Sequence, residues 1–189
     1  MNEFENLKRE KLTIDIVWAN IFGLILLVPI VLIYGIPFFI IWKNEMNFRD
    51  IFKDIFENHI LFKGILVLII GIIAHELIHG IFWAAFAKKG FKSIKFGVLW
   101  KMITPYCHCK EPLKVKHYIL GGIAPAIFMG VIPAITAMFT GSIWLLIFGM
   151  FFTLAACGDF LIINLLRKEK PDDYVEDHPS EAGCFIYRK

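Results

Sequence analysis

The sequence has little net charge and no concentrated basic segment. Its 20 Lys and Arg residues and 17 Asp and Glu residues leave a formal net charge of +3. Basic stripes with interleaved stacking aromatics, which are typical of nucleic-acid binding, do not occur in it. We therefore expect no nucleic-acid partner, and we use the basic residues as markers of membrane topology.

Cysteine is also scarce. The four cysteines are Cys107, Cys109, Cys157 and Cys184. The topology derived below places all of them at or towards the cytosolic side of a membrane, where thiols stay reduced, so we predict no disulfide. A signal-peptide cleavage site is not evident either, and the first apolar run is too long for such a peptide. We expect that run to be retained as a membrane span.

Apolar residues, in contrast, are abundant. They make up 58% of the 189 residues, and 19 residues are Phe, whereas about 45–50% apolar content is usual for soluble domains. Four apolar runs are long enough to cross a bilayer, at about residues 16–42, 64–87, 118–139 and 143–166. This pattern predicts a single all-α integral membrane domain over residues 1–189, with a tail at 167–189 that we expect to be cytosolic or partly disordered.

Two other segments have a recognisable periodicity. Residues 43–58 alternate apolar and charged residues at helical spacing, which predicts an amphipathic helix lying on the membrane surface. Residues 94–102, between the second and third spans, alternate with period two. This alternation predicts one strand of a short β-hairpin in that loop.

The distribution of positive charge predicts the orientation. With four spans, both termini and the loop at 88–117 lie on one side, and this side carries 16 of the 20 Lys and Arg residues. Because cytosolic loops are enriched in Lys and Arg, we expect a multi-pass protein of the cell membrane with both termini in the cytosol.

A short polar motif interrupts the second span. The sequence His75-Glu76-Leu77-Ile78-His79 has the pattern His-Glu-x-x-His, which is the signature of zinc hydrolases. On a helix the two histidines lie one turn apart on the same face, where both can bind one metal ion. Glu76 lies beside that ion and can take a proton from metal-bound water. The alternative is a helix end that reaches the polar interface, where His and Glu cost little.

A catalytic zinc normally has three protein ligands, so a third must come from elsewhere. The fourth span contains one acidic residue, Asp159. The second and fourth spans cross in the same direction, and His79 and Asp159 lie 8 and 7 residues before their predicted ends. At 1.5 Å per residue the two side chains are at equal depth, about 10–12 Å. Asp159 is therefore our candidate third ligand; the alternative is a carboxylate paired with a basic residue of a neighbouring span.

A rival group of possible ligands lies in the loop before the third span. Cys107, His108 and Cys109 could bind a soft metal, but a closed structural zinc site needs four ligands and this loop supplies three. We interpret it as a loop with a specific conformation near the active site. The remaining histidines, His59, His117 and His178, lie at span edges or in the tail, where we expect solvated side chains.

The chain resembles the putative zincin peptidase family of small membrane proteins over roughly residues 60–185. The matching features are the sequence at 75–80, the loop Tyr106-Cys107-His108-Cys109-Lys110-Glu111-Pro112-Leu113, Gly158-Asp159, and Asp177-His178-Pro179-Ser180. More distantly it is similar to the site-2 intramembrane metalloproteases. Those enzymes have Asp followed by Gly, whereas here Gly158 precedes Asp159. The resemblance implies zinc held by His75, His79 and Asp159, with Glu76 as the catalytic base.

Together these features predict a membrane-embedded zinc metallopeptidase. We expect it to hydrolyse peptide bonds of membrane proteins or peptides with a metal-activated water. The alternative is a membrane scaffold that binds a metal or a client protein without catalysis. A transporter is the weakest alternative, because one polar cluster does not make a path across the bilayer.

Overall fold

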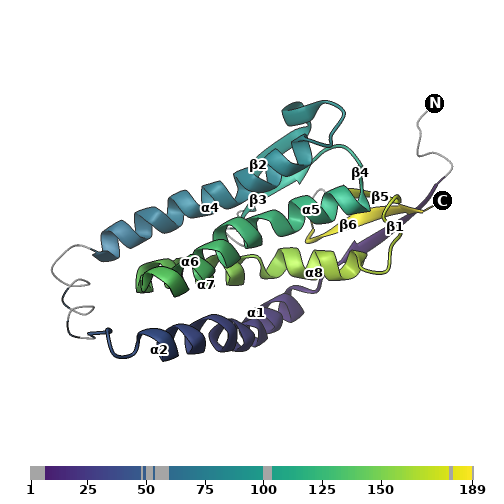
Figure 1. The fold of residues 1–189 in the computed structure, drawn as a ribbon. Coiled ribbons are helices and arrows are strands. Elements are labelled where there is room, and N and C mark those ends of the chain that lie inside the picture. Colours follow the sequence, from purple (N-terminus) through teal and green to yellow (C-terminus); the bar gives the residue numbers. More distant parts are fainter. Residues whose placement is uncertain are drawn as a thin grey trace.

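The computed structural model describes residues 7–47, 49, 53, 60–99, 104–178 and 181–188. It is mostly helical, with two small β-sheets at one end of the helical bundle (Figure 1). The helical expectation is therefore correct for the bundle, and the sheets add more strand than the single hairpin that we predicted.

Within the described residues, three apolar helical segments are long enough to cross a membrane without a sharp bend, Ile16–Trp42, Leu61–Ala84 and Val115–Thr140. They comprise α1 (Ile16–Ile30), a π-helical turn (Val31–Gly35) and α2 (Ile36–Trp42); α4 (Ile60–Ala84); and α5 (Val115–Pro125), a π-helical turn (Ala126–Val131) and α6 (Ile132–Thr140). Each π-helical turn is preceded by a proline inside the helix, Pro29 or Pro125. Proline removes one helical hydrogen bond and so favours a local change of helix geometry.

The fourth segment is broken where we predicted a continuous span. It consists of α7 (Ile143–Ala155) and α8 (Cys157–Leu166), which meet at 43°. Ala156 lies at the break with ψ near 8°, and its amide donates to the carbonyls of both Phe152 and Leu154. This tightened last turn ends α7. Helix α8 then starts in a new direction at Cys157, two residues before Asp159.

The predicted hairpin is present beside α4. Strand β2 (Ile94–Leu99) pairs antiparallel with β3 (Thr104–Cys109), with Ile94 opposite Cys109. Residues 100–103, which include Trp100 and Met102 of the predicted strand, lie outside the described residues. So does most of the amphipathic helix predicted at 43–58, and that helix stays a prediction.

A second sheet joins the two ends of the chain. Its strand order is β1-β6-β5-β4, formed by β1 (Lys8–Thr13), β6 (Gly183–Arg188), β5 (Tyr174–Asp177) and β4 (Leu113–Lys114), with antiparallel pairing throughout. The expectation of a partly disordered tail is therefore wrong for β5 and β6. The physical reason is a buried apolar face, because Val175, Cys184 and Ile186 are fully buried and this burial holds the tail in place.

The main core lies between this sheet and the neighbouring ends of α4, α5 and α8. Its buried residues are Trp83, Ala84, Ile94, Cys109, Leu113, Val115, Tyr118, Leu166, Val175, Cys184 and Ile186. The core thus fixes the end of α4 that carries His75 and His79. Further along the bundle the outward faces of the helices are apolar and exposed, as at Leu24, Phe62, Ile73 and Phe139.

Candidate metal centre

Helix α4 presents the two histidines of the motif on one buried face. The ring centroids of His75 and His79 are 5.0 Å apart, as expected for side chains four residues apart on a helix. The two residues are only 7% and 3% exposed. Both imidazoles therefore point into the protein. The alternative, in which the motif is a solvated helix end, does not describe this arrangement.

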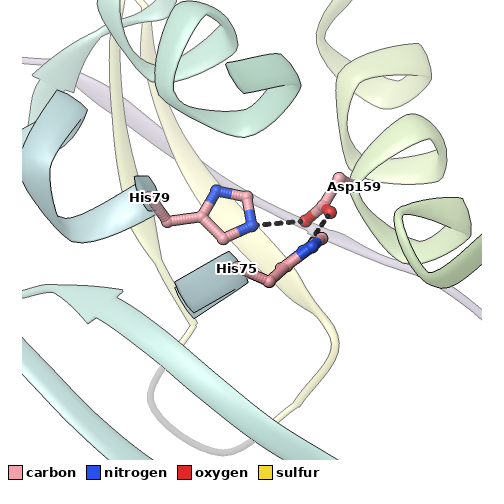
Figure 2. A group of neighbouring side chains, drawn as sticks. All are labelled: His75, His79 and Asp159. Atoms are coloured by element: carbon pink, nitrogen blue, oxygen red, sulfur yellow. Dashed lines mark ion pairs between the residues drawn. The ribbon is translucent and has the colours of Figure 1, made fainter. Parts of the chain in front are cut away.

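Asp159 meets them from the first turn of α8. Its Oδ2 atom lies 3.3 Å from Nε2 of His75, and its Oδ1 atom lies 3.4 Å from Nε2 of His79 (Figure 2). One potential ligand atom from each of the three residues lies within 4.8 Å of the other two. The equal depth predicted for His79 and Asp159 from the sequence agrees with this arrangement.

The break at Ala156 places the carboxylate. Since α8 starts at Cys157, Asp159 lies in its first turn, where the helix dipole stabilises negative charge. Basic side chains are not among its ion-pair partners; in the described part of the chain these partners are the two histidines. Among the described residues, Asp159 is therefore not paired with a Lys or Arg of another span.

The second ring nitrogen of His79 is bound by the backbone of α5. Its Nδ1 atom lies 2.9 Å from the carbonyl oxygen of Gly121. A carbonyl can only accept, so Nδ1 carries the proton and Nε2 keeps its lone pair for a metal. His75 differs, because its buried Nδ1 atom has no hydrogen-bond partner among the described residues.

A stack of rings supports His79 from the other side. The indole of Trp83 lies parallel to the His79 ring, with 5.0 Å between centroids, and also parallel to the Tyr118 ring at 5.0 Å. Trp83 Nε1 donates to the carbonyl of Tyr118 at 3.0 Å. The stack and this hydrogen bond hold the end of α4 against the start of α5.

The three side chains fit a zinc ion in chemistry and in spacing. Two imidazole nitrogens and one carboxylate form one of the usual ligand sets of catalytic zinc. Ligand bonds of about 2.0–2.1 Å in tetrahedral geometry place the ligand atoms about 3.3–3.4 Å apart. The two nitrogen–oxygen distances, 3.3 and 3.4 Å, are of this size and involve different oxygens of Asp159, so both carboxylate oxygens face the candidate metal position.

Glu76 borders the same cavity as the candidate ligands. The cavity has a volume of about 260 Å³, and its lining includes His75, Glu76, His79, Asp159 and residues 104–108 of β3. The carboxylate of Glu76 accepts a hydrogen bond from the backbone of Cys107. Glu76 thus lies on the wall of the cavity that the three candidate ligands also line.

The rival group in the loop does not assemble as a second centre. His75, His79 and Asp159 form the one group of three or more possible metal ligands found in the described residues. Cys107 and His108 line the cavity, and the thiol of Cys109 instead contacts the carbonyl of Glu111 at 3.4 Å. Burial raises the pKa of the Cys109 thiol to about 11, which disfavours the thiolate that a metal requires.

Asp177 is a cavity residue to which sequence reasoning gave no role. It accepts hydrogen bonds from the hydroxyl of Tyr118 and from the amide of Cys109, and it lies 3.9 Å from Nδ1 of His108. Burial raises the pKa of this carboxyl group. The available signal was the sequence Asp177-His178-Pro179-Ser180, which is one of the features that the chain shares with the family it resembles. The neighbouring His178, expected to be solvated, is also largely buried and accepts a hydrogen bond from the amide of Glu181.

His117 is partly exposed, and its ring stacks on Phe86 with 4.0 Å between centroids. His59 lies outside the described residues.

Comparison with known proteins gives one match. Residues 68–174, more than half of the chain, match the protein family described as "Putative zincin peptidase". Comparisons with curated proteins and with solved structures find no match. The matched range contains the His-Glu-x-x-His motif and Asp159. The chain therefore belongs to the putative zincin peptidase family.

Proposed function

We propose that this protein is a zinc-dependent endopeptidase that works within the membrane. The observation that carries the proposal is the meeting of Asp159 with His75 and His79 inside an apolar helical bundle, next to a carboxylate that reaches the same cavity. Family membership supports a metallopeptidase. The intramembrane setting, the likeness to site-2 proteases and the roles of the four residues are our inference.

The surface of the bundle supports insertion into a bilayer. Side chains along the outward faces of α1, α4 and α6 are large, apolar and exposed, among them Leu24, Ile73 and Phe139. In water such a surface is unfavourable, whereas lipid tails would cover it at no cost. Because β1 pairs with β6, both ends of the chain lie at one end of the bundle (Figure 1). Together with the excess of Lys and Arg at that end, this pairing supports cytosolic termini.

The chemistry follows from the residues of the cavity. Zinc bound by His75, His79 and Asp159 supplies a Lewis acid that lowers the pKa of water and polarises a peptide carbonyl. Glu76 is the group placed to accept the proton of that water and then to donate it to the amine of the leaving peptide. The three ligands and Glu76 come from only two helices, and the buried contacts around α4 hold them in register.

Strand β3 borders the space in which we infer that substrate binds. A peptide bond within a transmembrane helix is shielded until the helix unwinds, and an unwound segment needs partners for its backbone. In the described hairpin β2 pairs with one edge of β3, while residues 104–108 of β3 line the cavity beside Glu76. We infer that an extended substrate segment lies in the cavity along residues 104–108. It does so without adding a strand to β3, because Cys107 and Cys109 already donate their amides to Glu76 and Asp177 and residue 105 is a proline.

The decisive experiment separates a peptidase from a metal-binding scaffold. Wild-type protein, Glu76→Gln, His75→Ala and the control Glu45→Gln, which changes an exposed turn residue, are purified in detergent. Zinc content is measured together with cleavage of a set of labelled transmembrane peptides. We expect one zinc and cleavage in wild type and control, zinc without cleavage in Glu76→Gln, and neither in His75→Ala.

Two results would reject the peptidase. If Glu76→Gln cleaves peptides as fast as wild type, Glu76 is not the catalytic base. Zinc binding by the wild type with no cleavage of any peptide would favour the scaffold that binds a metal or a client.

A further inference from the structure

Helix α5 lacks one of its own hydrogen bonds at the candidate metal centre. In an α-helix the carbonyl of residue i accepts from the amide of residue i+4. For Gly121 that residue is Pro125, which has no amide hydrogen. The next amide, that of Ala126, donates to Ile123. The Gly121 carbonyl is therefore left without its usual donor.

His79 uses this carbonyl. The distance from its Nδ1 atom to the Gly121 oxygen is 2.9 Å, inside the protein. The bond keeps a proton on Nδ1, so that Nε2, which faces Asp159, is the nitrogen left to bind a metal. His75 has no such bond to its Nδ1 atom among the described residues, so His79 is the histidine of the pair that a backbone carbonyl orients.

A second contact, with Trp83, supports the His79 ring in this position. A Cβ atom on Gly121 would collide with the indole of Trp83, so the missing side chain is what lets Trp83 approach α5. Trp83 covers one face of the His79 ring and donates to the carbonyl of Tyr118, one turn before Gly121. Ring stacking sets the plane of His79, and the Gly121 carbonyl sets its rotation within that plane.

We propose that Pro125 is a positioning residue of the metal centre: by withholding an amide hydrogen, it frees the Gly121 carbonyl to orient His79. The proposal rests on the proposed function only in that this centre binds zinc. Pro125 is fully buried and acts through the backbone and His79. Its role differs from that of a proline that merely bends the span before the π-helical turn Ala126–Val131.

Restoring the amide hydrogen should weaken the centre. In Pro125→Ala the new amide competes with His79 for the Gly121 carbonyl, and the imidazole loses part of its orienting bond. Removing the outer hydrogen-bond partner of a metal-binding histidine typically costs about 10–100-fold in metal affinity. We expect the zinc dissociation constant of Pro125→Ala to rise by about that factor.

A backbone ester separates the two possible roles of the proline. Replacing residue 125 with lactic acid gives the side chain of alanine but, like proline, no amide hydrogen. Zinc affinity is measured by competition with a chelator for wild type, Pro125→Ala, the ester variant and Pro133→Ala, a control at the start of α6 in the same apolar segment. We expect the ester and the control to bind zinc like wild type.

A spectroscopic signal reports on the bond itself. In zinc-loaded protein labelled with ¹⁵N-histidine, the Nδ1 proton of His79 should give a downfield, slowly exchanging resonance in wild type and in the ester variant, weakened in Pro125→Ala. Unchanged affinity and resonance in Pro125→Ala would overturn the proposal, and so would an ester variant as weak as Pro125→Ala. Absence of zinc from the wild type would overturn it together with the proposed function. If the four proteins have the expected zinc affinities but the wild type cleaves no peptide, the peptidase is rejected and the role of Pro125 stands.

Discussion

The ring of Phe152 on α7 occupies the space that a side chain at Gly71 of α4 would need. A Cβ atom at Gly71 would lie 2.7 Å from Cε2 of Phe152, closer than real contacts allow. Phe152 is completely buried, and its ring also stacks on His75 with 6.2 Å between centroids. This contact sets how near the fourth apolar segment, which carries Asp159, comes to the histidines of α4.

Gly71→Ala should therefore loosen both the fold and the metal centre. Overpacking a close contact of this kind costs about 1–3 kcal/mol, and the displaced α7 should weaken zinc binding. Gly64→Ala is the matched control, since no atom lies within 4 Å of a Cβ at that position of the same helix. It should be neutral or stabilise the helix by up to about 1 kcal/mol. Unfolding in mixed micelles measures the stability of both variants. Equal changes in stability for Gly71→Ala and Gly64→Ala would contradict this role of Phe152.

Asp159→Asn should remove most of the zinc. The amide is a weaker ligand and lacks the charge that faces the two imidazoles. Removing a hydrogen-bond partner of a metal ligand costs about 10–100-fold in metal affinity. The loss of zinc affinity in Asp159→Asn should be larger than this. Asn164→Ala, an exposed position of the same helix, is the control and should keep its zinc. Normal zinc content in Asp159→Asn would exclude the third ligand that we infer.

The sequence was most informative where the pattern is local. The spacing of His75 and His79 determines their common face, and counting residues to the predicted ends of two spans brought Asp159 to the same depth. The break at Ala156 was not predictable in this way, because residues 155 and 156 are alanines with good helix propensity.

Contacts between distant parts of the chain were missed for another reason. Strand β1 pairs with β6 across almost the whole sequence, with Lys8 opposite Arg188. Strand β1 is too polar to be recognised alone, and the apolar residues of β6 do not by themselves indicate its partner. The hydrogen bond of His79 to Gly121 involves a backbone carbonyl, which has no identity in a sequence. Only the four-residue spacing of Gly121 and Pro125 hinted at it.

The buried thiols should be unreactive in the folded protein. Burial raises the pKa of Cys109 to about 11 and that of Cys184 to about 12. At pH 8 both groups are almost entirely protonated and covered, and the thiolate is the reactive form. Iodoacetamide followed by mass spectrometry should find Cys109 and Cys184 unmodified in native protein and modified after denaturation. Rapid native labelling of both would show that the core below the four-stranded sheet is open.

Asp172 should make a pH-dependent contribution to stability. It lies 2.9 Å from Lys116 and 3.0 Å from Lys114, and hydrogen bonds from these two amines lower its pKa to about 2. A carboxyl group whose pKa is lowered by folding stabilises the protein above its unfolded pKa, about 3.9, and loses this contribution as the pH falls through about 2. Asp172→Asn should thus be slightly less stable than wild type at pH 6 and equal to it near pH 2. Because the group is exposed, 1 M salt should shrink the difference at pH 6; a difference that grows at low pH would contradict this ion pair.

Gly183→Ala should detach the N-terminal strand. A Cβ atom at Gly183 would overlap the carbonyl of Leu12 and lie 2.8 Å from Cα of Thr13, both backbone atoms that cannot move aside without breaking the pairing of β1 with β6. We expect a loss of about 1–3 kcal/mol and faster trypsin cleavage after Lys8, Arg9 and Lys11. Ala182→Ser, at an exposed neighbouring position, should leave both unchanged. Gly183 also lines the cavity. If Gly183→Ala loses zinc as well, the sheet that joins the termini supports the metal centre. Trypsin resistance of Gly183→Ala equal to that of wild type would contradict the close approach of β1.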